Sequence, residues 1–194
     1  MRLRSLKHLL DAARGLVHPG QMTVMGSTAM LALDPELGER GQPLELSLDA
    51  DVLVEPFVER EAAVLHEAIG EGSLFHQEYG VYLDLLRPQI ATTLPPGWRP
   101  RRRPIDGASD ALFLDPYDAA LAKLVLGRDK DMALLRALLQ SRRLDFAELK
   151  TRFGETPLNE SELFRAGRNL NLLAEKPRET QRPPPPEPEE GPSP

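Results

Sequence analysis

The sequence predicts an α+β fold in which a small mixed β-sheet, with helices on one side, is followed by a helical C-terminal part. Two observations predict this arrangement. Segments with the alternation of β-strands are concentrated between residues 22 and 114, whereas the segments between 115 and 174 have helical spacing. Hydrophobic residues make up 41% of the 194 residues, which is enough to bury a core between a sheet and its helices.

The first elements are short and separated by clear breaks. Apolar residues recur at helical spacing over 3–16, and the His-Pro-Gly sequence at 18–20 ends this helix. Residues 22–25 are apolar and partly β-branched, so we predict a short buried strand. A second helix is predicted over 28–33, and the polar residues 34–43 are expected to form turns.

Residues 44–54 show the clearest strand pattern in the chain. Their side chains alternate strictly, so that Ser47, Asp49 and Asp51 share one face and apolar residues share the other. We therefore predict one long strand whose apolar face lies in the core. The residues expected on that face are Leu46, Leu48, Ala50, Val52 and Val54.

The next stretch is predicted to complete the sheet. Helical spacing over 57–69 is followed by a possible short strand at 74–76 and a better one at 79–86. Residues 91–103 are expected to form a turn and a basic segment, and 111–114 are predicted as the last strand.

The remaining elements are predicted helices. They cover 115–127, about 130–139, 146–153 and 160–173, and the first begins with Asp-Pro, a pair typical of a helix start.

Composition changes again at the C-terminus. Residues 175–194 are rich in proline and charged residues and cannot bury a core, so we expect them to be disordered. We therefore predict a core over 1–114, a helical subdomain over 115–174 and a tail over 175–194.

The composition excludes several classes of function. The net charge is −6, so the chain as a whole is not built to attract nucleic acid, although a local basic patch would suffice for RNA. Cysteine is absent, which excludes disulfides and thiolate metal sites. No apolar run approaches the roughly 20 residues that cross a bilayer, and no signal peptide is evident. We expect a cytoplasmic protein without a membrane partner.

The candidate chemistry centres on two aspartates and a Gly-Ser turn. Asp49 and Asp51 project from the same face of a predicted strand and offer the hard oxygen ligands that Mg²⁺ prefers. Gly26 and Ser27 lie between a predicted strand and a predicted helix, where backbone amides can hold phosphate. The pattern indicates Mg²⁺ and a nucleoside triphosphate. The alternative is two aspartates on a solvent-facing strand that bind nothing, since short motifs recur by chance.

These residues resemble the signature of a known superfamily. Gly26-Ser27, followed by Asp49-Ala50-Asp51, resembles the Gly-Ser…Asp-x-Asp signature of polymerase-β-like nucleotidyltransferases. The sequence LFLDPYDAALAKL at 112–124 and GRDKD at 127–131 are similar to a bacterial subgroup. That subgroup includes the toxins of abortive-infection (type IV) toxin–antitoxin systems and uncharacterised relatives, which LPPGWR at 94–99 also resembles.

The resemblance covers about residues 20–153 and departs from the family pattern mildly. Ala50 replaces a large aliphatic residue, and Ser47 stands where threonine is frequent. The resemblance implies that the chain moves a nucleoside monophosphate from a triphosphate to an acceptor hydroxyl. The acceptor would be RNA, such as a tRNA end, or a protein, and an antitoxin would be a further partner.

The resemblance also implies three further site residues. Asp84 is the best candidate for a third carboxylate, which would activate the acceptor; a surface aspartate on a strand is the alternative. Lys123 is expected to meet the triphosphate because a charge among apolar residues of a helix needs a reason. Asp131 would support that arrangement, the alternative being a solvated helix face.

Two questions stay open at this level. Four arginines beside Trp98 either contact RNA or form a solvated loop; they are Arg99, Arg101, Arg102 and Arg103. If Asp84 points away from the paired aspartates, the chain is a non-catalytic nucleotide- or partner-binding protein that keeps the fold.

Overall fold

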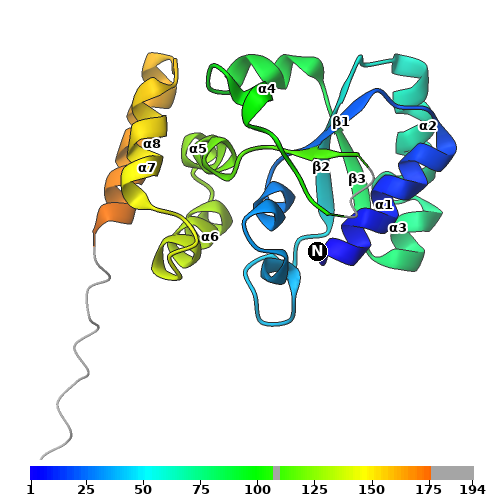
Figure 1. Ribbon diagram of the computed structural model, residues 1–194, viewed down its shortest axis with the longest axis horizontal. Helices are drawn as coiled ribbons and strands as arrows, with labels where there is room; N and C mark the ends of the chain where they lie inside the picture. The colour runs from blue at the N-terminus through cyan, green and yellow to red at the C-terminus, as the bar shows by residue number, and fades with distance from the viewer. Residues whose placement is uncertain (107–109, 176–194) are drawn as a thin grey trace, which may run out of the picture.

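The computed structural model describes residues 1–106 and 110–175, and its centre is a mixed β-sheet (Figure 1). Within these residues the sheet has five strands in the order β3-β2-β1-β5-β4. Strand β1 is antiparallel to β2 and parallel to β5, while β2 is parallel to β3 and β5 antiparallel to β4. The strands are β1 (Gln21–Val24), β2 (Asp49–Glu55), β3 (Tyr82–Leu86), β4 (Arg103–Pro104) and β5 (Leu112–Phe113).

Helices lie beside the sheet and continue into a separate C-terminal group. Helices α1, α2 and α3 lie together on one side of the sheet, and α5 to α8 gather at the other end of the molecule (Figure 1). The α+β class, the mixed sheet and the helical C-terminal part are therefore confirmed. The helices are α1 (Leu3–Leu16), α2 (Glu59–Ile69), α3 (Leu74–Tyr79), α4 (Trp98–Arg101), α5 (Pro116–Leu126), α6 (Asp129–Gln140), α7 (Phe146–Glu155) and α8 (Glu160–Ala174).

Strand β2 is shorter than the alternation predicted. It begins at Asp49, and the backbone before it turns through hydrogen bonds from Glu45 to Gln42 and from Ser47 to Leu44. As a result Leu46 is 87% exposed and Leu48 is 49% exposed, so their predicted place in the core is wrong. The physical reason is pairing: β3 pairs with β2 from residue 49 and β1 from residue 52, and within the described residues the only backbone hydrogen bond of β3 to the segment before them runs from the Tyr82 amide to the Leu48 carbonyl at 3.0 Å. An alternating segment without a partner strand gains no further ladder hydrogen bonds.

Residues 74–76, predicted as a short strand, belong instead to helix α3. The side chain of Ser73 caps this helix by accepting a hydrogen bond from the His76 amide at 3.1 Å. The rings of Phe75 and Tyr79, one turn apart, pack against each other and against His8 of α1. The capping serine and the ring contacts at helical spacing favour a helix more than the short apolar run favours a strand.

Short helical turns replace several predicted loops, and one predicted helix is a tighter turn. Residues 28–33, predicted as a helix, contain a 3₁₀ helix, and the turn regions around 34–43 and 91–94 contain two more. The sequence prediction also missed α4 and the two-residue strand β4. These elements are a single turn or shorter, so they carry no periodicity to detect. The 3₁₀ helices are η1 (Thr28–Ala32), η2 (Pro35–Gly38) and η3 (Pro88–Thr93).

Ion pairs to two buried aspartates join the helical group to α4 and β4. Asp118 of α5 is fully buried and accepts two hydrogen bonds of 3.0 Å from Arg101, and another from Arg152 of α7. Asp115, which caps α5, accepts from Arg103 at 2.9 Å and from Arg152 at 3.3 Å. The basic segment therefore connects α5 and α7 to the sheet.

The prediction for the tail falls on residues 176–194, which lie outside the described residues. Within the described part of the chain, no helix has the length and apolar character needed to span a bilayer.

Candidate functional site

The turn after β1 brings the backbone against Asp51. The Met25 amide donates to the carbonyl of Asp51 at 2.8 Å, which ties the end of β1 to β2. Gly26 follows with a φ of +59°. A Cβ atom at Gly26 would lie 1.7 Å from the Asp51 Oδ2 atom, so only glycine allows this approach. The turn then leads into η1 through Ser27.

The predicted carboxylates meet on one face of two neighbouring strands. Asp49 and Asp51 are two residues apart on β2, and Asp84 of β3 is the cross-strand neighbour of Asp51 in a parallel ladder. Side chains at such positions point to the same face of the sheet. Asp84 therefore lies beside the pair rather than away from it, and its side chain is exposed to solvent.

The electrostatics of Asp51 reflect this crowding. Burial, followed by the nearby charges of Asp49 and Asp84, raises the pKa of Asp51 to about 6. Like charges oppose ionisation of a partly buried carboxyl, and a cation among them would favour it. The three aspartates thus form a negatively charged site, which the nearby charges of Lys123 and Arg128 compensate only in part.

A buried cation lies across the turn from these carboxylates. Lys123 of α5 is 3% exposed and donates to the Ser27 hydroxyl at 2.7 Å and to Asp131 at 3.1 Å. Burial lowers the pKa of Lys123, and the charge of Asp131 opposes that effect. The structure therefore places Lys123 at the Gly-Ser turn and holds it there through Asp131.

Arg128, which precedes α6, completes this group. Its guanidinium donates to Asp131 at 2.6 and 3.2 Å. Burial acts to raise the pKa of Asp131, but hydrogen bonds from Arg128 and Lys123 outweigh burial and hold it below its usual value. In the sequence, this ion pair is indicated by the i, i+3 spacing of Arg128 and Asp131 at the start of α6.

Tyr82 is a further neighbour that sequence reasoning did not assign to the site. It pairs with Asp49 across the β2–β3 ladder, and its ring lies 4.7 Å from that of His76. Burial and the charges of Asp49, Glu71 and Asp84 raise the pKa of the Tyr82 hydroxyl. Its position two residues before Asp84 on the same strand face was the available signal.

The donor set fits Mg²⁺ bound together with phosphate. Among the residues that the structure describes, no three His, Asp or Glu side chains are close enough to hold a metal ion by themselves. Mg²⁺ commonly takes one or two carboxylates and completes its shell with water and substrate phosphates. Asp49 and Asp51 supply that number of carboxylates, beside a turn where phosphate oxygens can reach the backbone.

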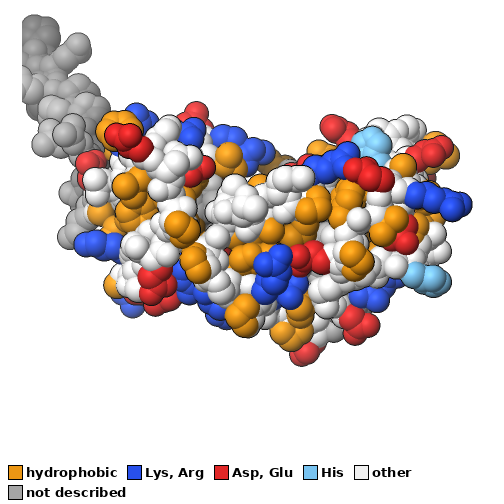
Figure 2. Space-filling model, turned by 90° about the horizontal axis from the view of Figure 1, so that it is seen from above, with side chains coloured by type: hydrophobic (Ala, Val, Ile, Leu, Met, Phe, Trp, Pro, Cys, Tyr) orange, Lys and Arg blue, Asp and Glu red, His pale blue; other side chains and the backbone are white. Residues whose placement is uncertain are grey.

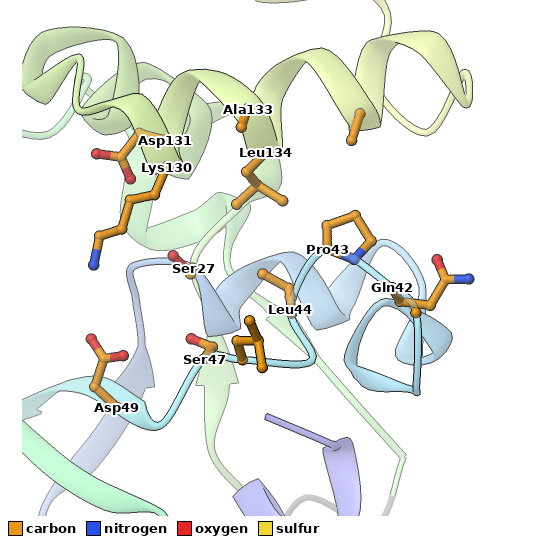
Figure 3. Close-up of a pocket in the computed structure, with 13 residues that line it drawn as sticks. Ser27, Gln42, Pro43, Leu44, Ser47, Asp49, Lys130, Asp131, Ala133 and Leu134 are labelled. Carbon is orange, nitrogen blue, oxygen red and sulfur yellow. The ribbon is translucent and has the colours of Figure 1, made fainter.

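A pocket of about 500 Å³ opens next to these residues, between α6 and the segment that precedes β2 (Figure 3). Ser27, Asp49, Lys130 and Asp131 line one end of it. In the close-up, Lys130 and Leu134 extend from α6 across the opening, toward Asp49 and Leu44 on the other wall.

The arginine segment does not present a free basic patch. Arg99 pairs with Glu55 at 2.7 Å, and Arg102 donates to the Thr23 hydroxyl at 2.8 Å, while Arg101 and Arg103 bind the aspartates of α5. On the face seen from above, Lys and Arg side chains are interspersed with Asp and Glu (Figure 2). All four arginines therefore have partners within the fold, which the solvated-loop alternative did not foresee, and their contact with RNA stays a prediction.

Comparison with known families identifies the class of protein. A family model described as "Nucleotidyltransferase of unknown function (DUF6036)" matches residues 2–171, a range that includes the sheet, the Gly-Ser turn, the carboxylates and Lys123. Comparisons with curated proteins and with solved structures found no match. The family match spans far more than half of the chain, and the chain belongs to this family of nucleotidyltransferases.

Proposed function

We propose that this protein transfers a nucleoside monophosphate from a nucleoside triphosphate to an acceptor hydroxyl, using Mg²⁺ held by Asp49 and Asp51. One observation carries the proposal: three aspartates share one face of β2 and β3 beside the Ser27–Lys123 pair. Membership of a nucleotidyltransferase family supports the reaction class.

The triphosphate would bind across the Gly-Ser turn. The backbone at Gly26 and Ser27 donates to phosphate oxygens, and Lys123 supplies a positive charge at the same turn. Asp131 and Arg128 fix the position of Lys123. Bound Mg²⁺ would neutralise the triphosphate and stabilise charge on the leaving group.

Transfer itself needs an activated acceptor. The acceptor oxygen forms a bond to the α-phosphorus, the bond from that phosphorus to the oxygen bridging to the β-phosphate breaks, and pyrophosphate leaves with those electrons. Asp84 takes the hydroxyl proton, because it is exposed to an incoming acceptor and neighbours Asp51 on the same face. A non-catalytic binding protein is the alternative, and the place of Asp84 beside Asp51 favours catalysis.

Label transfer tests this proposal. The protein is incubated with Mg²⁺, each α-labelled nucleoside triphosphate and, as acceptors, total cellular RNA or soluble cell protein. We expect label on one acceptor, lost in Asp49→Ala and retained in Glu78→Ala, which removes an exposed carboxylate from α3. Transfer that persists in Asp49→Ala would contradict the assigned site, and no transfer to any acceptor would contradict the reaction.

The acceptor and the biological role follow from the subgroup resemblance and need separate tests. RNA, in particular a tRNA end, is the first acceptor to examine, and an antitoxin protein is the implied partner. The four arginines already have partners within the fold, so RNA phosphates would compete with those partners at this segment. A toxin role predicts growth arrest on expression that Asp49→Ala abolishes; normal growth with active protein would argue against it.

A further inference from the structure

The pocket beside the aspartates changes character along its length. Its charged end belongs to the site already described. Away from that end its walls are mainly apolar, although Gly41, Gln42 and Ser47 also contribute to them. The apolar lining residues there are Pro43, Leu44, Leu46, Ala133, Leu134 and Ala137.

The two apolar walls come from different parts of the fold. On α6, Ala133 and Ala137 lie one turn apart, so small side chains leave the space open along this face. Opposite them, the turns before β2 contribute Leu44, which is buried, and Leu46, which is 87% exposed. An exposed leucine at the rim of an apolar recess is surface that a ligand can cover.

The charged end limits what the occupant can be. A ligand with its phosphates at Ser27 and Lys123 and its metal at Asp49 must extend either into solvent or into this pocket. A volume of about 500 Å³ is within the range of small-molecule sites. The part of the ligand next to the phosphates must also present apolar surface, because those walls offer few hydrogen-bonding groups.

We propose that this pocket holds the nucleoside part of the triphosphate, with the base between the α6 wall and the Leu44–Leu46 wall. A base has two apolar faces, which the alkyl side chains of Leu46 and Leu134 can cover, and its ribose would lie near Ser47. The inference rests on the proposed function, since it takes the phosphate end of the pocket as given. Under this inference the base contributes to the binding free energy as well as the phosphates.

The test compares nucleoside triphosphates with inorganic tripolyphosphate, each with Mg²⁺, by titration calorimetry. We expect the best nucleoside triphosphate to bind at least about tenfold tighter than tripolyphosphate, because covering the apolar walls adds more than 1.4 kcal/mol. Ala133→Trp fills the pocket from an exposed helix position and should remove that advantage while leaving tripolyphosphate affinity unchanged. Ala147→Trp makes the same change on an exposed position of α7 that does not line the pocket, and should have no effect.

A second variant keeps the test valid if Ala133→Trp does not fold. Leu46→Ala removes an exposed side chain, so it should leave the fold intact and weaken nucleoside triphosphate binding several-fold without affecting tripolyphosphate. If tripolyphosphate binds as tightly as every nucleoside triphosphate, or if neither pocket variant alters the difference, the inference is wrong and the phosphate site stands. If neither ligand binds, the proposed function fails together with it.

Discussion

Gly26 shows how closely the site depends on single residues. Its φ of +59° and the 1.7 Å approach of a hypothetical Cβ to Asp51 Oδ2 are two separate obstacles to any other residue. We expect Gly26→Ala to displace the Asp51 carboxylate and abolish Mg²⁺-dependent nucleotide binding. The strained φ alone should cost about 1–2 kcal/mol of stability. Thermal unfolding and nucleotide titration measure the two effects.

Gly80→Ala provides the matched control. Gly80 has a φ of +68°, but nothing lies within 4 Å of its hypothetical Cβ. This variant should lose about 1 kcal/mol of stability from backbone strain and still bind nucleotide. Equal nucleotide binding by both variants would contradict the role assigned to Gly26.

The raised pKa of Asp51 predicts that the stability of the metal-free protein depends on pH. The pKa of Asp51 in the fold is about 6, above the ordinary aspartate value of 3.8, so between these values the folded protein keeps a proton that the unfolded chain has released. The contribution of Asp51 to the free energy of unfolding therefore falls as pH rises through this window and is constant above it.

Asp51→Asn removes that titration. The variant should be more stable than the parent by roughly 1–3 kcal/mol above pH 6, with the advantage vanishing near pH 4. Chemical denaturation of both proteins at a series of pH values, with a chelator present, measures this difference in the free energy of unfolding. A difference between the two proteins that does not vary with pH would refute the explanation.

At the scale of elements, the ion pairs around Asp118 explain how the helical part is held on the sheet. Asp118 is fully buried, and both Arg101 and Arg152 donate to it. Burial raises the pKa of Asp118, and the bonds from Arg152 and Arg101 offset part of that rise. The carboxylate therefore depends on both arginines to stay charged in the interior.

We expect Asp118→Ala to lower the free energy of unfolding by about 3 kcal/mol, because two partly buried guanidinium groups lose a buried carboxylate and Arg152 keeps only Asp115 as a buried partner. Glu148→Ala removes a carboxylate that is 47% exposed from the same arginine, and should cost at most about 1 kcal/mol. Urea denaturation compares the two. Equal losses would show that burial adds nothing to this network.

Local pattern predicted most elements but not their limits. The sequence placed α1, β1 and the four C-terminal helices within a few residues, because each has a full period of apolar residues or a clear cap. It extended β2 too far and made a strand of α3, because pairing partners and side-chain caps decide those cases. The division of the chain at 114/115 stays a prediction.

At the scale of the whole molecule, the site is assembled from distant segments. The i, i+2 spacing of Asp49 and Asp51 was enough to predict that they share a face. The register that sets Asp84 beside Asp51, and the contact between Lys123 and Ser27, depend on long-range packing that no local pattern encodes. The sequence could name these residues as candidates by resemblance, whereas their meeting required the fold.

Substitution of Asp84 separates nucleotide binding from turnover and tests the proposed catalytic site most directly. Pyrophosphate release in the presence of Mg²⁺, the preferred triphosphate and its acceptor should fall at least about 100-fold in Asp84→Asn, because the hydroxyl proton loses its base. Triphosphate affinity should change little, since Asp49, Asp51 and Lys123 remain. Release at the parental rate in Asp84→Asn would show that the three aspartates do not form one catalytic site.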